Sequence, residues 1–583
     1  MAGSLIREVF GLQKAQKVTD GTKGFPAVLS SVVRHPSSVA VTLMALSLAV
    51  TLLAALPVHG PTYMDADYYL LTAQRLYRGF GFIENILWNY LDDPAGLPHP
   101  SHVYWMPLPS ILAALGLWLF GDSFRAAQFP FILLTAFLPL VSYRLSRALG
   151  GEQRHAWAAG LFTVFSGFYL VFWAMPDAFA AYALAGSLSL IALGQGWAGR
   201  GRRWFFLAGL GAGFGHLARA DGLLLLLTGL GMIAWKSIHR RDAEEAQETR
   251  FLRETRFLKC LRLGGEQSFF TISAAGLVLL LGYLLVMAPW FYRNWVAAGA
   301  VLPGAGLQTL FLRDYDELFS YGLPLTLERY LDWGLGNILA SKLWAARLNL
   351  MTFVGPNNLI FLTPFTLIGL WRLRHEPLMR PALVYGVLLY AAMTLAFTFP
   401  GVRGGLLHSS VALLPFFFAA APVGLEATVR WVARRRRGWH VQQAMRVFTA
   451  GFIVLAAALS LALTMRTMQG EHWIGGSSEV YRQIGAWLSG QGLEEATVMV
   501  NNPPGFALRT GHPAIVVPNG DVDTLLAVAD RYGATVLVLD ANRPGPLAGL
   551  YAGTEAHPRL IRQVELDGAQ VYRIVSEAGN GGS

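Results

Sequence analysis

Cysteine is almost absent from this sequence of 583 residues, and the common nucleotide-binding signatures are missing. Cys260 is the only cysteine, so the chain can form neither an intrachain disulfide nor a cysteine-rich metal site. The sequence contains no P-loop and no serine nucleophile elbow. Gly505 is not part of a GxGxxG fingerprint, so no nucleotide site is indicated.

Charged residues are also scarce. They make up 14% of the chain, whereas 54% of the residues are hydrophobic and the mean hydropathy is +0.42. This composition is more apolar than that of an average soluble domain. Several apolar runs approach the ~20 residues that are needed to cross a bilayer. We therefore expect an α-helical polytopic membrane protein.

The net charge of +10 would suggest nucleic acid in a soluble protein, but its distribution indicates a membrane here. Arginines cluster between the apolar runs, as in cytoplasmic loops that face anionic lipid. We expect the N-terminus in the cytoplasm and no nucleic-acid partner. The clusters that fall on one side of the predicted topology are 144–154, 200–203, 236–262, 372–380 and 434–437.

About eleven membrane spans are predicted between residues 38 and 466, behind a basic cytoplasmic leader at 1–37. The run 106–120 begins with two prolines and is short for a span, so we expect a helix along the membrane surface. An odd number of spans places the C-terminus outside. The predicted spans are 39–57, 127–145, 155–173, 178–196, two within 204–235 with a polar break at 216–222, 268–290, 355–371, 381–399, 405–424 and 444–465.

Residues 467–583 have the pattern of a small extracytoplasmic α/β domain. Strand-like and helical runs alternate, and turn signals stand at 501–505 and 518–520. The domain lacks a cluster of titratable residues, so we expect it to be dispensable for chemistry and relevant to acceptor choice or stability. The predicted helices are 477–488 and 522–532, and the predicted strands are 497–500, 514–517, 535–539, 560–566 and 570–575.

The first outer loop, residues 58–126, is the richest in residues that carry chemistry. Linkers rarely combine so many acids with tyrosine and tryptophan, so we expect this loop to form a site; a solvated linker is the alternative. Its acids and histidines include Asp65, Asp67, Glu84, Asp92, Asp93, His99 and His102.

The order of motifs in this loop resembles a known family. Asp-x-Asp-Tyr-Tyr at 65–69 follows the first span, and His-Pro-Ser-His-Val-Tyr-Trp at 99–105 leads into an apolar segment. This is similar to the first outer loop of GT-C glycosyltransferases, specifically relatives of protein O-mannosyltransferases and lipid A aminoarabinose transferases. The resemblance covers roughly residues 30–430; His99 replaces the family's lysine.

The resemblance implies an enzyme of the bacterial inner membrane. It would transfer a hexosyl or pentosyl group from a polyprenyl-phosphate donor to a lipid, glycan or protein acceptor at the outer face. A transporter or lipid flippase, or a non-catalytic scaffold, is the alternative. Transporters usually interrupt their spans near the midplane, whereas here the charges gather at the outer ends of spans and in one large loop. This favours the enzyme.

Three aspartates are candidates for catalysis: Asp65, Asp67 and Asp177. The transfer needs a base for the acceptor proton, and neighbouring carboxylates oppose each other's ionisation. Asp65 matches the acid that opens the family motif, so we expect it to be the base, with Asp67 orienting it or holding a cation. At i and i+2 the two share a site only if the backbone turns. Helix caps are the alternatives for Asp65 and Asp177.

The donor phosphate needs cations or hydrogen-bond donors. Arginines at the predicted outer ends of spans suit it, because guanidinium forms bidentate bonds with phosphate. We expect Arg293 first, since its Pro-Trp-x-x-Arg-Asn context resembles the family, then Arg219 and Arg403, with His99 at the position of the family's lysine. Snorkelling at the interface is the alternative, and Arg219 has a second alternative in an ion pair with Asp221.

The remaining site residues concern the sugar and a metal. We expect Tyr68, Tyr104 and Trp105 to stack on sugar rings, with an interfacial aromatic belt as the alternative. No cofactor is certain. The resemblance to metal-dependent oligosaccharyltransferases leaves open a divalent cation, Mg²⁺ or Mn²⁺, at Asp65 and Asp67. His99-x-x-His102 with nearby acids is a weak metal signal.

Overall fold

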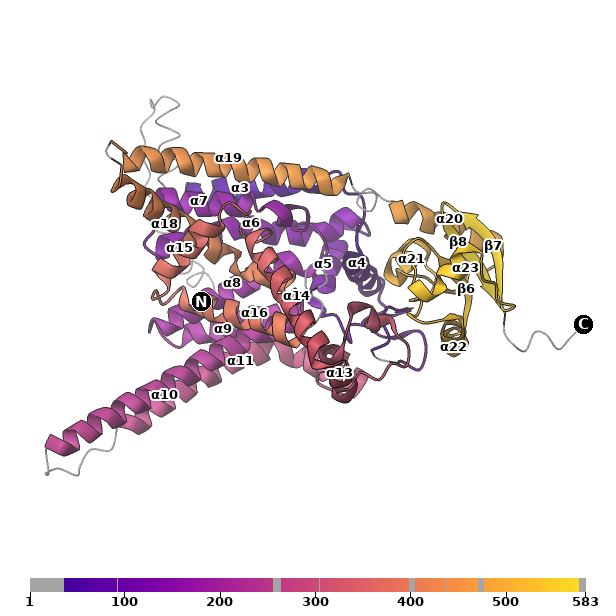
Figure 1. Cartoon of the computed structure of the whole chain (residues 1–583), viewed down its shortest axis with the longest axis horizontal. Coiled ribbons are helices and arrows are strands. Elements are labelled where there is room, and N and C mark those ends of the chain that lie inside the picture. The colour runs from indigo at the N-terminus through magenta and orange to yellow at the C-terminus, as the bar shows by residue number, and fades with distance from the viewer. Residues whose placement is uncertain are drawn as a thin grey trace, which may run out of the picture.

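The computed structural model describes residues 36–575 except 92, 255–263, 303–304, 398–403, 437 and 470–475. Arg403, and the predicted leader apart from its last two residues, therefore lie outside the described residues. A helical bundle forms one part of the molecule, and the C-terminal domain lies at one end of it (Figure 1). Helices α10 and α11 project as a hairpin from the opposite end.

Seven helices in the described ranges are long and apolar enough to cross a membrane. The segment Gly405–Ala433 is 94% buried and forms the centre of the bundle, whereas the span of α19 is 17% buried, so its sides face outward. The helices that contain these segments are α3 (Pro36–Ala55), α6 (Phe124–Ala148), α8 (Ala178–Trp197), α10 (Leu223–Glu254), α11 (Gly264–Ala298), α17 (Gly405–Ser409) with α18 (Leu414–Ala433), and α19 (Val441–Met468).

The other four predicted spans also contain helices, but these are shorter. The segment predicted as one span at 155–173 does not form one continuous helix, because Gly167 adopts a positive φ of 62°. The N–H of Gly167 donates to Ser460 Oγ at 2.8 Å. The run 204–235 is divided at its polar break, as predicted. The four helices are α7 (Gln153–Val164), α9 (Arg203–Ala218), α15 (Thr363–Leu373) and α16 (Arg380–Ala391), which ends in a π-helical turn, Ala392–Ala396.

Two long loops of the bundle, which the sequence predicts to be outer loops, contact the C-terminal domain. The first contains α4 (Met64–Tyr77), β1 (Ile83–Glu84), β2 (Ile86–Leu87), β3 (His99–Pro100) and α5 (Leu108–Phe120). Helix α5 is the short helix predicted at 106–120, and it packs on α4 and α6. The second loop contains α12 (Ala305–Gln308), α13 (Leu327–Asp332), α14 (Leu335–Val354) and the 3₁₀ turns Thr309–Phe311 and Tyr315–Phe319.

The C-terminal domain is a small α/β unit, as predicted. Its sheet has the order β2-β5-β4-β6-β8-β7, in which the first four strands are parallel and the last two antiparallel. Its elements are α20 (Gly476–Gly490), β4 (Thr497–Met499), α21 (Pro503–Thr510), β5 (Ala514–Ile515), α22 (Val522–Tyr532), β6 (Ala534–Leu539), α23 (Ala548–Ala552), β7 (Leu560–Leu566) and β8 (Ala569–Ile574).

One strand of this sheet comes from far away in the sequence. β2, in the first outer loop, pairs with β5, and Val516 N donates to Leu87 O at 2.8 Å. The pairing covers the edge that β5 would otherwise expose, and open edges invite unwanted strand addition. The predicted division at residue 467 thus separates two segments that share one sheet.

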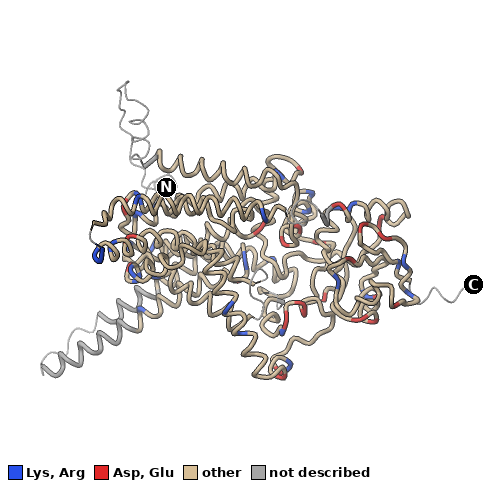
Figure 2. The backbone as a smooth tube through the Cα atoms, turned by 45° about the horizontal axis from the view of Figure 1, so that its top comes forward, with Lys and Arg blue, Asp and Glu red and all other residues tan. Residues whose placement is uncertain are grey.

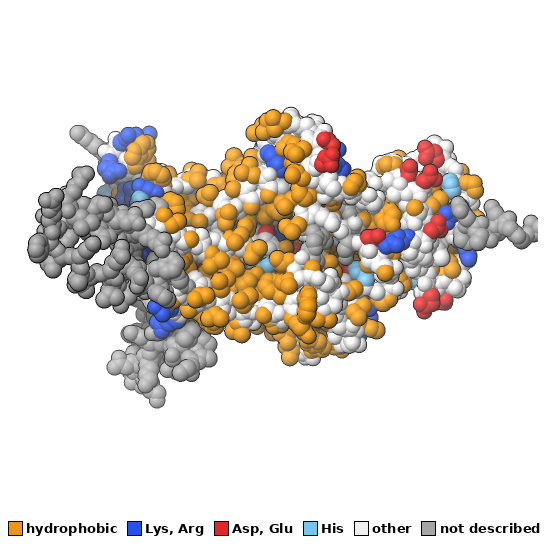
Figure 3. All heavy atoms as spheres, turned by 90° about the horizontal axis from the view of Figure 1, so that it is seen from below, with side chains coloured by type: hydrophobic (Ala, Val, Ile, Leu, Met, Phe, Trp, Pro, Cys, Tyr) orange, Lys and Arg blue, Asp and Glu red, His pale blue; other side chains and the backbone are white. Residues whose placement is uncertain are grey.

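Polar and apolar side chains are sorted along the long axis. Basic residues gather at the end of the bundle away from the C-terminal domain, while most acidic residues lie in the outer loops and in that domain (Figure 2). Between the two ends, the visible face of the bundle is largely hydrophobic (Figure 3). Such a belt suits the hydrocarbon core of a membrane.

Candidate active site

A cavity of about 890 Å³ lies where the bundle, both outer loops and the C-terminal domain meet. The bundle contributes apolar side chains such as Phe172, Phe179 and Leu224. The C-terminal domain contributes the polar side chains Asn501, Asn519, Asn542 and Arg543 together with Val516, Val517 and Pro544. The charged and histidine side chains that line it are Asp65, His102, His216, Arg219, Asp221, Asp316, His408 and Arg543.

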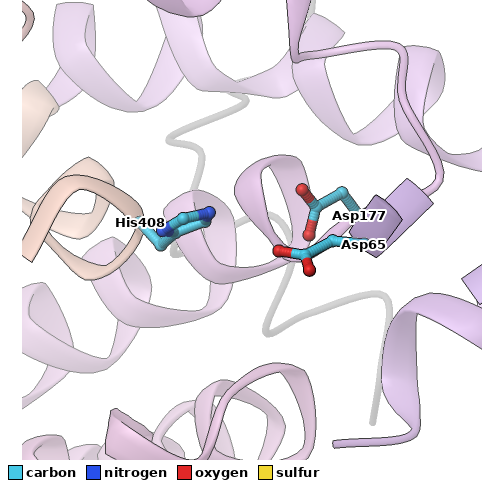
Figure 4. A group of neighbouring side chains, drawn as sticks. All are labelled: Asp65, Asp177 and His408. Atoms are coloured by element: carbon cyan, nitrogen blue, oxygen red, sulfur yellow. The ribbon is translucent and has the colours of Figure 1, made fainter. Parts of the chain in front are cut away.

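Asp65, Asp177 and His408 come together from three separate elements; Asp65 and His408 line the cavity, and Asp177 lies beside Asp65. Asp65 stands in the first turn of α4, Asp177 precedes α8, and His408 belongs to α17. One ligand atom of each lies within 4.8 Å of the others, and Figure 4 shows the imidazole directed toward the two carboxylates. Two carboxylate oxygens and an imidazole nitrogen are a suitable set for a divalent cation.

Neighbouring groups hold two members of this trio in place. Tyr63 donates its hydroxyl to Asp177 Oδ2 at 2.8 Å, while Asp177 Oδ1 accepts from the N–H of Ala178. Asp177 is therefore the N-cap of α8, as the alternative interpretation predicted, and its carboxylate also lies beside that of Asp65. His408 Nδ1 donates to the carbonyl of Gly404 at 3.3 Å, which leaves Nε2 as the unprotonated nitrogen of the neutral ring.

The environment of Asp65 favours proton transfer near neutral pH. Burial raises the pKa of Asp65 to about 7, the charge of Asp177 adds to the rise, and Arg219 opposes it. A base performs best when its pKa lies near the working pH.

Arg219 lies in the polar break between α9 and α10. Its Nε donates to Asp221 Oδ1 at 3.1 Å, and Asp221 Oδ2 accepts from Ser409 Oγ at 2.5 Å. The ion pair expected as an alternative thus exists. The two terminal amino groups of Arg219 have no hydrogen-bond partner in the part of the chain that the structure describes, so they can bind an anion in the cavity.

Comparison with known proteins gives one family-model match and several similar structures. The model described as dolichyl-phosphate-mannose-protein mannosyltransferase matches residues 99–246. ArnT from Cupriavidus metallidurans bound to undecaprenyl phosphate has a TM-score of 0.55 at 14% identity, and the match covers 92% of this chain and 98% of that one. The chain has the GT-C fold. The fold predicted from the order of motifs is thereby confirmed.

A second GT-C structure is also similar. It is the Archaeoglobus fulgidus oligosaccharyltransferase in complex with Zn and sulfate, with a TM-score of 0.53 at 13% identity; the match covers 88% of this chain and 69% of that one. A search of curated proteins gives no match.

Arg293 and His99, which the sequence predicts to bind the donor, do not line the cavity of about 890 Å³. Arg293 donates to the carbonyl of Phe82 at 2.9 Å and stacks on Trp290, with its guanidinium carbon 4.8 Å from the ring centre. It is not among the residues that line the cavity. His99 Nε2 lies 2.8 Å from the carbonyl oxygen of Ile86, and His99 lines a different cavity of about 710 Å³. Both residues therefore support the first loop.

Asp67 does not share a site with Asp65. Because α4 begins at Met64, residues at i and i+2 point about 200° apart. Asp67 accepts from Arg509 Nη1 at 2.7 Å and from Asn502 Nδ2 at 3.0 Å, and both partners belong to the C-terminal domain. The expectation that Asp67 orients Asp65, or holds a cation with it, is therefore wrong in its geometry, and Asp177 and His408 are the nearby groups.

The predicted aromatic residues are divided between the cavity and the layer behind it. Tyr104 and Trp105 line the cavity, and Trp105 stacks on Trp88 at 4.1 Å between ring centres. Tyr68 lies behind them, where its hydroxyl oxygen accepts from the N–H of His102 at 2.9 Å. Tyr104 and Trp105 therefore remain available to a sugar, whereas Tyr68 supports the loop.

The His-x-x-His pattern forms no metal site with the acids that the structure describes. His102 Nδ1 lies 3.0 Å from Ser101 Oγ and its Nε2 lies 3.1 Å from Ser110 Oγ. Asp93 accepts from Arg531 and Tyr532, and Asp92 lies outside the described residues.

Proposed function

We propose that this protein transfers a sugar from a polyprenyl-phosphate donor to an acceptor at the extracytoplasmic face of the bacterial inner membrane. One observation carries the proposal: Asp65 and the cation Arg219 line one large cavity, and the carboxylate of Asp177 lies beside that of Asp65. The transfer needs a base and a stabilised leaving phosphate. The similar ArnT structure, bound to undecaprenyl phosphate, supports a lipid phosphate as carrier.

The orientation follows from charge. The basic residues gather at the end of the bundle opposite the C-terminal domain, and cytoplasmic loops are usually the basic ones. The cavity and the domain would then face the outside, where a lipid carrier supplies the activated sugar.

In the proposed step Asp65 accepts the proton of the acceptor group. The acceptor atom forms a bond to the anomeric carbon, the bond from that carbon to the phosphate oxygen breaks, and the electron pair leaves with polyprenyl phosphate. Arg219 stabilises the departing phosphate. Tyr104 and Trp105 present aromatic faces to the sugar.

The direct test uses the full chain in lipid nanodiscs with a panel of undecaprenyl-phosphate hexoses and pentoses. Release of undecaprenyl phosphate from one of them, in the presence of membrane extract as acceptor source, is the expected result. Cells that lack the protein should accumulate that donor, which would identify the sugar. No release from any donor, with no accumulation in the cells, would contradict the proposal.

Arg219→Gln is expected to lower the affinity for undecaprenyl phosphate by roughly tenfold to a hundredfold. A hydrogen bond to a charged group contributes about 1.5–3 kcal/mol, and the substitution removes the cation that lies next to Asp65 and Asp221 in the cavity. Equilibrium binding in nanodiscs measures the change. Arg78→Gln is the matched control, because Arg78 is exposed and pairs with Asp122. Unchanged affinity in folded Arg219→Gln would rule out this role.

Asp65, Asp177 and His408 would hold a divalent cation, and the imidazole favours Mn²⁺ or Zn²⁺ over Mg²⁺. A bound cation would supply charge that stabilises the leaving phosphate. Each carboxylate has two oxygens, so Asp65 can present one oxygen to the acceptor and the other to the cation that it would share with Asp177 and His408.

The metal proposal predicts that the purified full chain retains about one equivalent of Mn²⁺ or Zn²⁺. His408→Ala should lose it, as measured by elemental analysis and, for Mn²⁺, by electron paramagnetic resonance. His216→Ala is the control, because His216 lines the cavity outside the trio and binds Tyr283. Equal metal content in wild type and His408→Ala would exclude this site.

A further inference from the structure

The C-terminal domain forms one wall of the cavity with the carboxyl ends of its parallel strands. β2, β5, β4 and β6 run side by side in the same direction. In open α/β sheets, ligands bind in the crevice outside these ends. Each of the four strands is followed within a few residues by side chains that line the cavity: Trp88, Asn501, Asn519, Asn542 and Arg543. The wall therefore has the placement of a ligand site.

Arg543 is a cation of this wall that forms no direct ion pair with a carboxylate of the described residues. Its Nη1 donates to the backbone carbonyls of Asp540 and Ala541 at 3.5 and 3.3 Å, and its guanidinium stacks on Tyr551. Its Nε is buried and has no hydrogen-bond partner. Burial raises the pKa of the nearby Asp540 carboxyl, and the charge of Arg543 opposes this rise, so the protein compensates this cation in part, without a direct ion pair in the described ranges.

Other donors on the wall are also unused. Trp88 is 6% exposed, and its indole N–H has no hydrogen-bond partner among the described residues. Buried donors are normally paired, and an unpaired one costs free energy. Asn501 is half-buried and Asn542 is exposed, and their side-chain amides make no hydrogen bond within the described part of the chain, so both are open to a ligand. Amides can donate to and accept from hydroxyl groups.

We propose that this wall is the acceptor subsite and that it takes a saccharide carrying a phosphate or carboxylate group. The proposal rests on the proposed function. The guanidinium of Arg543 matches anionic oxygens, while Asn501 and Asn542 match sugar hydroxyls. Asp316 also lines the cavity, and its carboxylate can accept from further hydroxyls.

The division of the lining between the two ends assigns the wall to the acceptor. The bundle side combines the charged group around Arg219 with apolar side chains such as Phe172, Phe179 and Leu224, and a polyprenyl chain is soluble in the membrane beside it. The C-terminal domain side carries Arg543 and asparagines and lies at the far end of the molecule from the basic loops (Figure 2). A lipid-linked donor therefore enters from the bundle, and a polar acceptor enters beside the domain.

Ligand-observed NMR titrations of the full chain in nanodiscs test the subsite. The probes are glucose, glucuronate and glucose 6-phosphate, with undecaprenyl phosphate as the donor-side probe. We expect the two charged sugars to bind roughly tenfold more tightly than glucose. Arg543→Gln should abolish this preference and leave undecaprenyl phosphate affinity unchanged. Arg543→Lys should retain part of the preference for charged sugars, because lysine keeps the positive charge but cannot form the bidentate hydrogen bonds of a guanidinium group.

Arg573→Gln is the matched control, because Arg573 is an exposed arginine of the same sheet. Wild-type protein that binds all three sugars equally would overturn the proposal, as would an Arg543→Gln protein that keeps the preference. If Arg543→Gln lost undecaprenyl phosphate binding, Arg543 would belong to the donor site, and the proposal of an acceptor subsite would also be overturned. If sugar transfer and undecaprenyl phosphate binding are both absent in wild type, the proposed function fails, whatever the saccharide preference.

Discussion

Replacing Asp65 with asparagine is expected to lower the rate of sugar transfer by roughly 10²–10⁴, the usual contribution of a positioned base. Asparagine keeps the size of the side chain and much of its hydrogen bonding, but it cannot accept the proton of the acceptor. Donor affinity should stay unchanged, because the base acts on the acceptor. Single-turnover kinetics with the donor, together with undecaprenyl phosphate binding, measure the two effects separately.

Two aspartates serve as comparisons for this substitution. Asp122→Asn makes the same change at an exposed position that pairs with Arg78, and it should leave the rate intact. Asp67→Asn makes it in the same turn of α4, and the folded fraction of this protein should still transfer sugar. Normal turnover in Asp65→Asn would end the hypothesis, while a loss of turnover confined to Asp67→Asn would move the role to Asp67.

The sequence predicts the parts of this molecule that depend on local pattern. Apolar runs, arginine clusters and the motif at 65–69 led to the membrane helices, the GT-C fold and the first outer loop. The alternation of strand-like and helical runs in residues 467–583 also predicted the small α/β domain. Three helices, α7, α15 and α16, are nevertheless shorter than predicted, because hydropathy does not register interruptions such as the positive φ of Gly167.

The parts that were missed depend on contacts between distant residues. His408 joins Asp65 and Asp177 only after the bundle has formed; from the sequence, a polar contact within the bundle is favoured over a proton shuttle for this histidine, and neither interpretation places it beside the two acids. β2 is two residues long, too short to show a periodicity. The partners of Asp67 lie more than 400 residues away, since 435 positions separate it from Asn502.

These contacts change the expected role of the C-terminal domain. A domain that is dispensable for chemistry should be joined to the bundle by a linker and a small surface. Here it shares a sheet with the first loop, contributes Arg543 to the cavity, and holds Asp67 through Arg509. We therefore expect truncation after Gln469 to disturb the cavity, contrary to the sequence-based expectation.

The ion pair between Arg509 and Asp67 connects the domain to the helix that carries Asp65. The two side chains are 10% and 3% exposed. Arg509 also donates to the carbonyls of Gly505 at 2.9 Å and Pro61 at 3.2 Å. Asn502 completes the group by donating to Asp67 and accepting from Gly505 N at 3.0 Å, as the N-cap of α21. This group fixes the first turn of α4 against the domain.

Arg509→Met is therefore expected to destabilise the docked protein by about 3–5 kcal/mol, because removal of one partner leaves a buried charge uncompensated. Chemical unfolding in detergent measures the loss, and faster hydrogen exchange over α4 should accompany it. Arg482→Met is the control: its pair with Glu479 is more than half exposed, so the cost should be about 0–1 kcal/mol. Adding Asp67→Leu to Arg509→Met should restore much of the stability, since no buried charge then remains. An Arg509→Met protein as stable as the Arg482→Met control would show that the domain is held by its sheet alone.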